Sequence, residues 1–182
     1  SRDESRLDLE PAMSQLPLFA AEARARKPAA SSPALWEAAA AFVAGTTPER
    51  SAGLAGLLAF GPSGFTRLHL HLFASRLCEP DLRLRHSIIG ALAAALDDNA
   101  PPGVRGCLLD LLGAFGPTQV DWMAETLSAA PGSRLPAARL LSYIPGAGEH
   151  LTRLAADLKK DGPLRAAAAL LIGEVGFVDA AP

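Results

Sequence analysis

The side chains that most often carry chemistry in proteins are sparse in this sequence and match no known catalytic or metal-binding pattern. The histidines and cysteines are His69, His71, His86, His150, Cys78 and Cys107. His69 and His71 are two positions apart on a predicted helix, so they do not share a face. Neither cysteine belongs to a Cys-x-x-Cys pair, a usual spacing of zinc ligands. We therefore expect surface or boundary histidines, two small buried cysteines and no metal site.

The acidic residues form pairs that have no nucleophile or base at a meaningful spacing. Asp97 and Asp98 lie at the end of a predicted helix, and Glu22 and Glu37 lie on either side of a linker. The sequence also lacks the Gly-x-Ser-x-Gly, Walker A, Gly-x-Gly-x-x-Gly and His-Glu-x-x-His motifs. We expect no catalytic residue, no cofactor and no enzymatic activity.

Four arginines at related positions could form one charged surface. They are Arg50, Arg85, Arg105 and Arg165. Three of them stand at the same distance before a glycine, which is Gly61, Gly116 or Gly176. Guanidinium groups pair well with phosphate and carboxylate groups, so one hypothesis is a surface that binds phosphate or an acidic peptide.

The elements that must position these arginines are helices. Apolar residues recur at helical spacing in about nine segments joined by short turns, and no useful stretch alternates as a strand does. The predicted helices cover residues 33–44, 48–60, 63–78, 81–97, 104–115, 118–129, 135–144, 149–160 and 163–175. This pattern predicts an all-α domain over residues 33–182, behind a tail and linker at residues 1–32.

The helices repeat one unit, whose clearest copy is Gly162-Pro-Leu-Arg-Ala-Ala-Ala-Ala-Leu-Leu-Ile-Gly-Glu-Val-Gly176. A looser copy runs from Pro102 to Gly116, and units recur about every 30 residues. Residues 48–178 thereby resemble the HEAT-repeat family in its short form, which is also found in phycobilisome-lyase-like repeats. The resemblance implies an α-solenoid of stacked antiparallel helix pairs that supplies a binding surface. It also implies that the repeated arginine more often bonds backbone carbonyls, or an acid of the neighbouring repeat, than a ligand.

Two places depart from a regular repeat. Only Asn99 to Gly103 separate the helix headed by Arg85 from the next one, so no second helix fits there and we expect a kink or local repacking. Phe177 to Pro182 read as the entry into a second helix of the last unit. We therefore expect the repeat domain to be truncated at its C-terminus, as a piece of a longer protein.

The tail contains one short apolar motif, Gln15-Leu16-Pro17-Leu18-Phe19. It resembles the bacterial sliding-clamp-binding pentapeptide, with Pro17 in place of a small polar residue. The resemblance implies that Gln15 hydrogen-bonds at a pocket rim while Leu16, Leu18 and Phe19 fill an apolar pocket. The alternative is that these apolar residues fold back and cap the open end of the helical stack near Trp36.

Composition restricts the partners that we expect. The chain of 182 residues has 17 Lys+Arg against 19 Asp+Glu, a net charge of −2, whereas duplex-DNA binders usually show a basic excess. No apolar run approaches the roughly 20 residues of a membrane span, and the two cysteines suit a reducing compartment. We expect a cytoplasmic, bacterial protein that binds neither duplex DNA nor a membrane.

Together, these features favour a non-enzymatic scaffold for protein–protein interaction. One alternative is an accessory factor of DNA replication or repair that docks on the sliding clamp through residues 15–19. The other is a chromophore-lyase-like enzyme or subunit, which the missing acid–base constellation opposes. The identity of the partner, the oligomeric state and the helix face that binds stay open.

Overall fold

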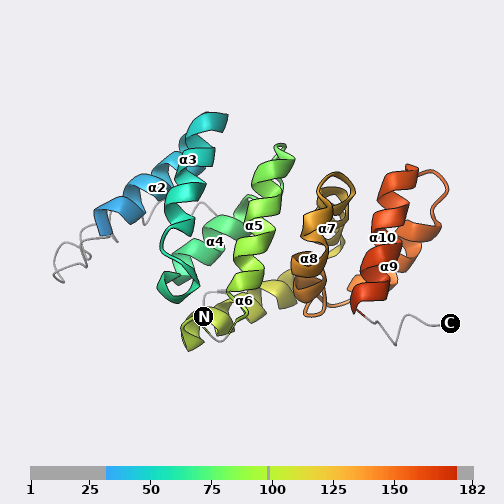
Figure 1. Ribbon diagram of the computed structural model, residues 1–182. Coiled ribbons are helices and arrows are strands. Elements are labelled where there is room, and N and C mark those ends of the chain that lie inside the picture. Colours follow the sequence, from blue (N-terminus) through green and yellow to red (C-terminus); the bar gives the residue numbers. More distant parts are fainter. Residues whose placement is uncertain (1–31, 98, 176–182) are drawn as a thin grey trace.

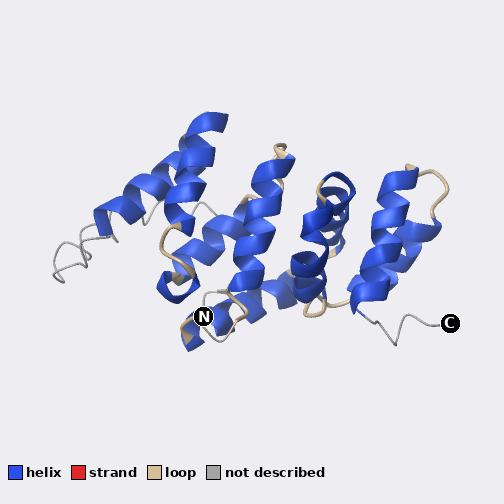
Figure 2. Cartoon of the chain, viewed as in Figure 1, coloured by secondary structure: helices blue, strands red, loops and turns tan. Residues whose placement is uncertain are grey.

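The computed structural model describes residues 32–97 and 99–175, and all regular structure in these residues is helical (Figure 1). The prediction of an all-α fold is confirmed for this part of the chain, which contains no strand (Figure 2). The α-helices are α2 (Ser32–Ala44), α3 (Thr47–Leu58), α4 (Arg67–Ser75), α5 (Leu82–Ala94), α6 (Pro102–Ala114), α7 (Pro117–Ala129), α8 (Arg134–Leu141), α9 (Ala147–Ala156) and α10 (Gly162–Val175). Two short 3₁₀-helices, η1 (Pro62–Gly64) and η2 (Pro131–Ser133), precede α4 and α8.

Side-chain caps fix where several helices begin. The backbone N–H of Thr46 donates to Glu49 Oε2 at 2.8 Å at the start of α3. Asp81 Oδ1 accepts from the N–H of Arg83 at 2.9 Å before α5, and Asp161 Oδ1 accepts from the N–H of Leu164 at 2.7 Å at the start of α10. Each bond satisfies an N–H that has no partner within its helix.

The helix α4 begins later than the sequence pattern predicts. The prediction placed its start at Ser63, but residues 62–64 form η1 and α4 begins at Arg67. The cause is a cap at Thr66, whose backbone N–H donates to His69 Nδ1 at 3.0 Å. His69 takes the place that Glu or Gln usually has in a capping box.

The helices follow one another along an elongated molecule, from α2 at one end to α10 at the other (Figure 1). At the two ends, α2 packs on α3 and α9 packs on α10. Between them, α3 contacts α5, α5 contacts α8, and α8 contacts α10. These contacts form one continuous line of helices through the molecule.

The helix α6 stands outside that line. It packs mainly on α4, whereas α5 contacts α7 and α8 directly. The repacking expected where α5 gives way to α6 is therefore present. Helices that carry a repeated arginine therefore do not all occupy equivalent positions in the fold. The helix α5, which carries Arg85, packs on α8, whereas α6, which carries Arg105, packs mainly on α4.

Leu and Ala side chains dominate the interior, with Phe42, Phe73 and Met123 among the largest fully buried residues. The α2–α3 crossing is especially close. A Cβ atom at Gly53 would lie 2.5 Å from Phe42 N and 2.7 Å from Ala38 O, both of which are backbone atoms. Glycine at this position lets the two helices touch.

The helix α9 ends earlier than predicted. It stops at Ala156, and Asp157 Oδ1 accepts from the N–H of Lys159 at 3.0 Å in the turn that follows. The helical spacing of Leu151, Leu154 and Leu158 within the predicted helix 149–160 places Leu158 on the apolar face, but Leu158 is 81% exposed, so that interpretation is wrong. Among the helices that the structure describes, none is both long and apolar enough to cross a lipid bilayer.

Candidate functional site

The four repeated arginines share one local task in the structure. Each donates to a backbone carbonyl at or just beyond the end of an earlier helix. Nη1 of Arg50 donates to Gly45 O at 3.1 Å, and Nε of Arg85 donates to Glu79 O. Nε of Arg105 and Nε of Arg165 donate at 3.1 Å to Leu96 O and Ala155 O, respectively. A cation suits this place because the last carbonyls of a helix lack partners and carry partial negative charge.

Arg50 also binds a carboxylate that is almost fully buried. Its Nη2 and Nε donate to the two oxygens of Glu79 at 2.7 and 3.1 Å, and Glu79 is 1% exposed. The side-chain hydrogen bond with Glu79 raises the pKa of Arg50 above its usual value. This two-pronged geometry is the strong form of an arginine–carboxylate pair, and it ties α3 to the turn before α5.

Arg85 binds a carboxylate in a similar way, with a more exposed partner. Its Nη1 donates to Glu125 Oε2 at 2.9 Å, which connects α5 to α7. Glu79 thus accepts from Arg50 through its side chain and from Arg85 through its backbone. The first two arginines of the series therefore each bind both a backbone carbonyl and a carboxylate within the chain.

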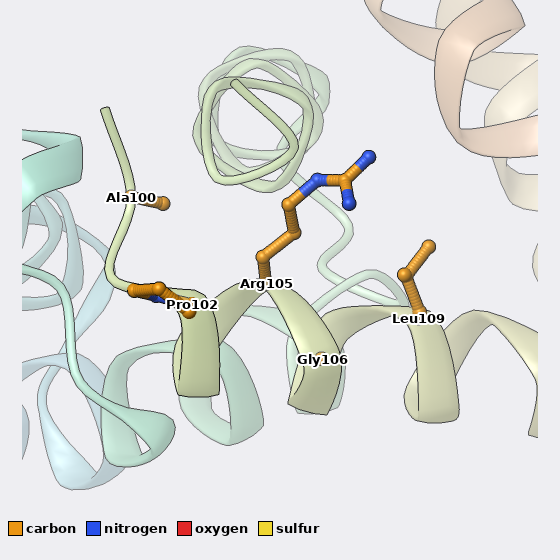
Figure 3. A pocket seen from close by; sticks show the side chains of 5 residues that line it. All are labelled: Ala100, Pro102, Arg105, Gly106 and Leu109. Atoms are coloured by element: carbon orange, nitrogen blue, oxygen red, sulfur yellow. The ribbon is translucent and has the colours of Figure 1, made fainter. Parts of the chain in front are cut away.

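Among the residues that the structure describes, neither Arg105 nor Arg165 binds such a carboxylate. Apart from the bond of Nε to Leu96 O, the guanidinium of Arg105 makes no hydrogen bond or ion pair to any residue in 32–97 or 99–175. The side chain instead lines an open cavity of about 280 Å³. Figure 3 shows Arg105 and Leu109 projecting from the same side of α6, with Pro102 at its first turn and Ala100 in the preceding segment.

No known protein family, curated protein or solved structure matches this chain at a significant level. Function must therefore be argued from the side chains themselves. The other site that the sequence indicates, Gln15, Leu16, Leu18 and Phe19, lies outside the residues that the structure describes.

His69 is the most unusual polar residue in the described part of the chain. It is fully buried, so the prediction of a surface or boundary position is wrong. Its ring lies 5.1 Å from Phe60, 5.2 Å from Phe65 and 6.1 Å from Phe73 between ring centres. Burial lowers the pKa of His69 to about 4, which keeps the ring neutral. Because Nδ1 accepts from the N–H of Thr66, the proton is assigned to Nε2, which is buried without a hydrogen-bond partner.

The remaining histidines connect neighbouring helices. His86 Nδ1 lies 2.7 Å from Ser133 Oγ, and His150 Nε2 lies 2.6 Å from Asp121 Oδ1. His71 Nε2 lies 4.0 Å from Cys107 Sγ. Within residues 32–97 and 99–175, no three His, Cys, Asp or Glu residues are grouped closely enough to hold a metal ion.

The two cysteines differ from each other. Cys78 is exposed, so the prediction that it is buried is wrong. Its Sγ donates to Ser75 O at 3.6 Å. Cys107 is half-buried on α6, where it faces His71 of α4.

Sequence reasoning did not identify Glu79 as the partner of Arg50 or Asp121 as the partner of His150. A signal for them exists in the repeat itself. Arg50 and Glu79 are 29 positions apart, as are Asp121 and His150. Residues about one repeat apart lie side by side when helical units stack. Opposite charges at that separation could have been paired before the structure was known.

Proposed function

We propose that the chain is a non-enzymatic scaffold for protein–protein interaction, built as a HEAT-like α-solenoid. The helix pairs α2/α3 and α9/α10, and the line of contacts α3–α5–α8–α10, support a stacked arrangement. The arginine bonds to helix ends support a common structural unit. Such stacks offer long surfaces to partners and need no catalytic group.

Two exposed leucines on the adjacent helices α8 and α10 carry the proposal. Leu135 of α8 is 61% exposed and Leu170 of α10 is 49% exposed. Arg134 Nη2 lies 2.6 Å from Glu174 Oε1, which brings the start of α8 to the last turn of α10. Leu170 is one turn before Glu174 and therefore on the same side of α10. Large exposed apolar residues on adjacent helices, with a charged pair at their edge, are typical of a protein-binding surface.

The test is a capture experiment with the immobilised chain and an extract of the cells that make it. We expect captured proteins to be lost with the double variant Leu135→Ser/Leu170→Ser and kept with Leu158→Ser. Leu158 is the matched control, because it is also an exposed leucine but lies in the α9–α10 turn. Equal capture by all three proteins, or no specific capture by the wild type, would refute the scaffold proposal. Unchanged melting temperatures show that the variants fold.

The pentapeptide Gln15-Leu16-Pro17-Leu18-Phe19 supports a second candidate, recruitment to the bacterial sliding clamp. Burial of three apolar side chains, less the general cost of ordering a peptide on binding, suits an affinity of about 1 µM. The test compares clamp binding by the wild type and by the variant Gln15→Ala/Leu16→Ala/Phe19→Ala. Lost binding with unchanged melting supports docking. No clamp binding by the wild type, with melting lowered in the variant, instead makes the segment an internal cap.

A further inference from the structure

The arginine series contains an internal comparison that defines a ligand for Arg105. Arg50, Arg85 and Arg105 each donate to a carbonyl near the end of an earlier helix. Arg50 and Arg85 also donate to the carboxylates of Glu79 and Glu125, respectively. In the described part of the chain, Arg105 and Arg165 make only the first of these two kinds of bond, and of these two only Arg105 lines the cavity described above. Its two Nη groups are left as donors beside a cavity.

The cavity has the lining that a short acidic segment of a polypeptide needs. Apolar surface comes from Ala100, Pro102 and Leu109, and the charge comes from Arg105. The volume of about 280 Å³ lies just below the range of small-molecule sites, which starts near 300 Å³, so it suits one or two side chains. Arg105 and Leu109 are one helical turn apart and project from the same side of α6 (Figure 3).

The described acid that follows Leu96, whose carbonyl accepts from Arg105, is bound to another arginine. Asp97 forms an ion pair with Arg139 of α8. Asp97 therefore has its own cation, and the Nη groups of Arg105 have no hydrogen-bond or ion-pair partner among residues 32–97 and 99–175. A planar guanidinium held by its Nε can present both Nη groups to a carboxylate.

We infer that the cavity at Arg105 is a docking site for an acidic side chain of a partner protein. A Glu or Asp carboxylate binds the Nη groups of Arg105, as Glu79 binds Arg50 within the chain. An aliphatic neighbour of that acid rests on Pro102 and Leu109. This inference names a contact of the proposed scaffold and rests on that proposed function.

The probe is a pair of tripeptides, acetyl-Leu-Glu-Leu-amide and its isosteric glutamine counterpart, titrated into the ¹⁵N-labelled full chain. We expect the glutamate peptide to shift the amide signals of Arg105 and Gly106 saturably. Binding of the glutamine peptide should be at least about fivefold weaker, because a hydrogen bond to a charged group is worth more than a neutral one. Equal shifts from both peptides, or no saturable shift near α6, would overturn the assignment. The assignment would also be overturned if inorganic phosphate shifted the same amide signals at a lower concentration than the glutamate peptide does.

Two variants test the residues that line the cavity. Arg105→Gln should weaken binding of the glutamate peptide at least about fivefold, whereas Arg153→Gln, at an exposed arginine on α9, should not. Because Arg105→Gln also removes the bond to Leu96 O, a second variant leaves Arg105 intact. A Cβ at Gly106 would meet no atom within 4 Å, so Gly106→Glu adds a negative charge at the cavity without steric conflict. We expect Gly106→Glu to abolish peptide binding and Gly106→Ala to keep it; retained binding in Gly106→Glu contradicts the inference.

The outcomes separate this inference from the scaffold proposal. If the tripeptide fails to bind near Arg105 but Leu135→Ser/Leu170→Ser still abolishes capture, only the cavity assignment falls. If the tripeptide binds as expected but no protein is captured by the wild type, the cavity is an acid-binding site and the scaffold proposal falls.

Discussion

The two halves of the described chain are built from similar helices but differ in which side chains they bury and which they expose. From α2 to α5, the ring contacts join Phe42, Phe60, Phe65, His69 and Phe73, and the carboxylate of Glu79 is buried. From α8 to α10, large apolar side chains reach solvent. Leu135, Tyr143, Leu158 and Leu170 are all at least 45% exposed. The first half buries a cluster of aromatic rings and one carboxylate, whereas the second half leaves several large apolar side chains exposed.

The ion pairs also differ in burial, as is seen when the pair between α3 and Glu79 is compared with the pair that joins Asp97, just after α5, to Arg139 of α8. Arg50 and Glu79 have side chains that are 18% and 1% exposed, whereas Arg139 and Asp97 are 49% and 46% exposed. A buried pair is costly to break, because removal of one partner leaves the other group without compensation. An exposed pair contributes little, because water competes for both groups. The comparison shows that an arginine–carboxylate pair should contribute more to stability where the acid is buried, as Glu79 is, than where both groups are exposed.

The largest effect should come from the α2–α3 crossing. We expect Gly53→Ala to lower the free energy of unfolding by about 3 kcal/mol, because the added methyl group meets backbone atoms of α2 at 2.5 and 2.7 Å. The control is Gly113→Ala on α6, where a Cβ meets nothing within 4 Å. That substitution should stabilise the protein by up to about 1 kcal/mol through helix propensity. Urea unfolding measures both, and a neutral Gly53→Ala would show that the crossing can open.

The next effect concerns the buried carboxylate. We expect Glu79→Gln to lower the melting temperature by several degrees, because the amide keeps the shape but loses the charge that Arg50 binds. Asp97→Asn is the matched control at the exposed pair with Arg139 and should change melting very little. Calorimetry of the two variants compares the two ion pairs directly. Similar melting temperatures of the two variants would mean that the buried and the exposed ion pair contribute equally to stability.

A third effect is the response of the aromatic cluster to acid. His69 has a folded-state pKa of about 4, below the ordinary value of 6.5, so the unfolded chain binds the proton first as pH falls. Its contribution to stability is complete above pH 6.5 and is lost as pH falls from 6.5 toward 4. Between pH 7 and pH 5 this loss amounts to about 2 kcal/mol. His71, whose pKa is also lowered by burial and by Arg67, acts with the same sign.

The measurement is urea unfolding of the wild type and of His69→Gln at both pH values. Glutamine does not titrate and can still accept from the N–H of Thr66 as a capping-box residue. We therefore expect a lower stability for the variant at pH 7 but a smaller difference between the two pH values. If the free energy of unfolding changes between pH 7 and pH 5 by the same amount in His69→Gln as in the wild type, the pKa of His69 is not lowered by folding as its burial implies.

The sequence predicted the helices well because periodicity, proline starts and glycine stops are local signals. It could not place α6, since the same apolar pattern serves whichever neighbour a helix meets. The four arginines were found by their recurrence, but their acids were not, because Glu79 and Glu125 belong to other helical units. Likewise, the burial of His69 depends on the rings of Phe60 and Phe65, which lie in the segment between α3 and α4 and pack against it. Residues that meet across units leave only a weak trace in a single sequence.

The smallest effect should come from a substitution at the end of α9, where the sequence pattern and the structure disagree on whether Leu158 is buried. The helical spacing of Leu151, Leu154 and Leu158 predicts that all three are buried, whereas the structure leaves Leu158 81% exposed. We therefore expect Leu158→Ser to change the free energy of unfolding by less than about 0.5 kcal/mol. Leu154→Ala, at a buried position one turn earlier, should cost about 2–5 kcal/mol. If urea unfolding shows similar losses for both variants, Leu158 is covered in solution and the second half of the molecule is less open than the comparison holds.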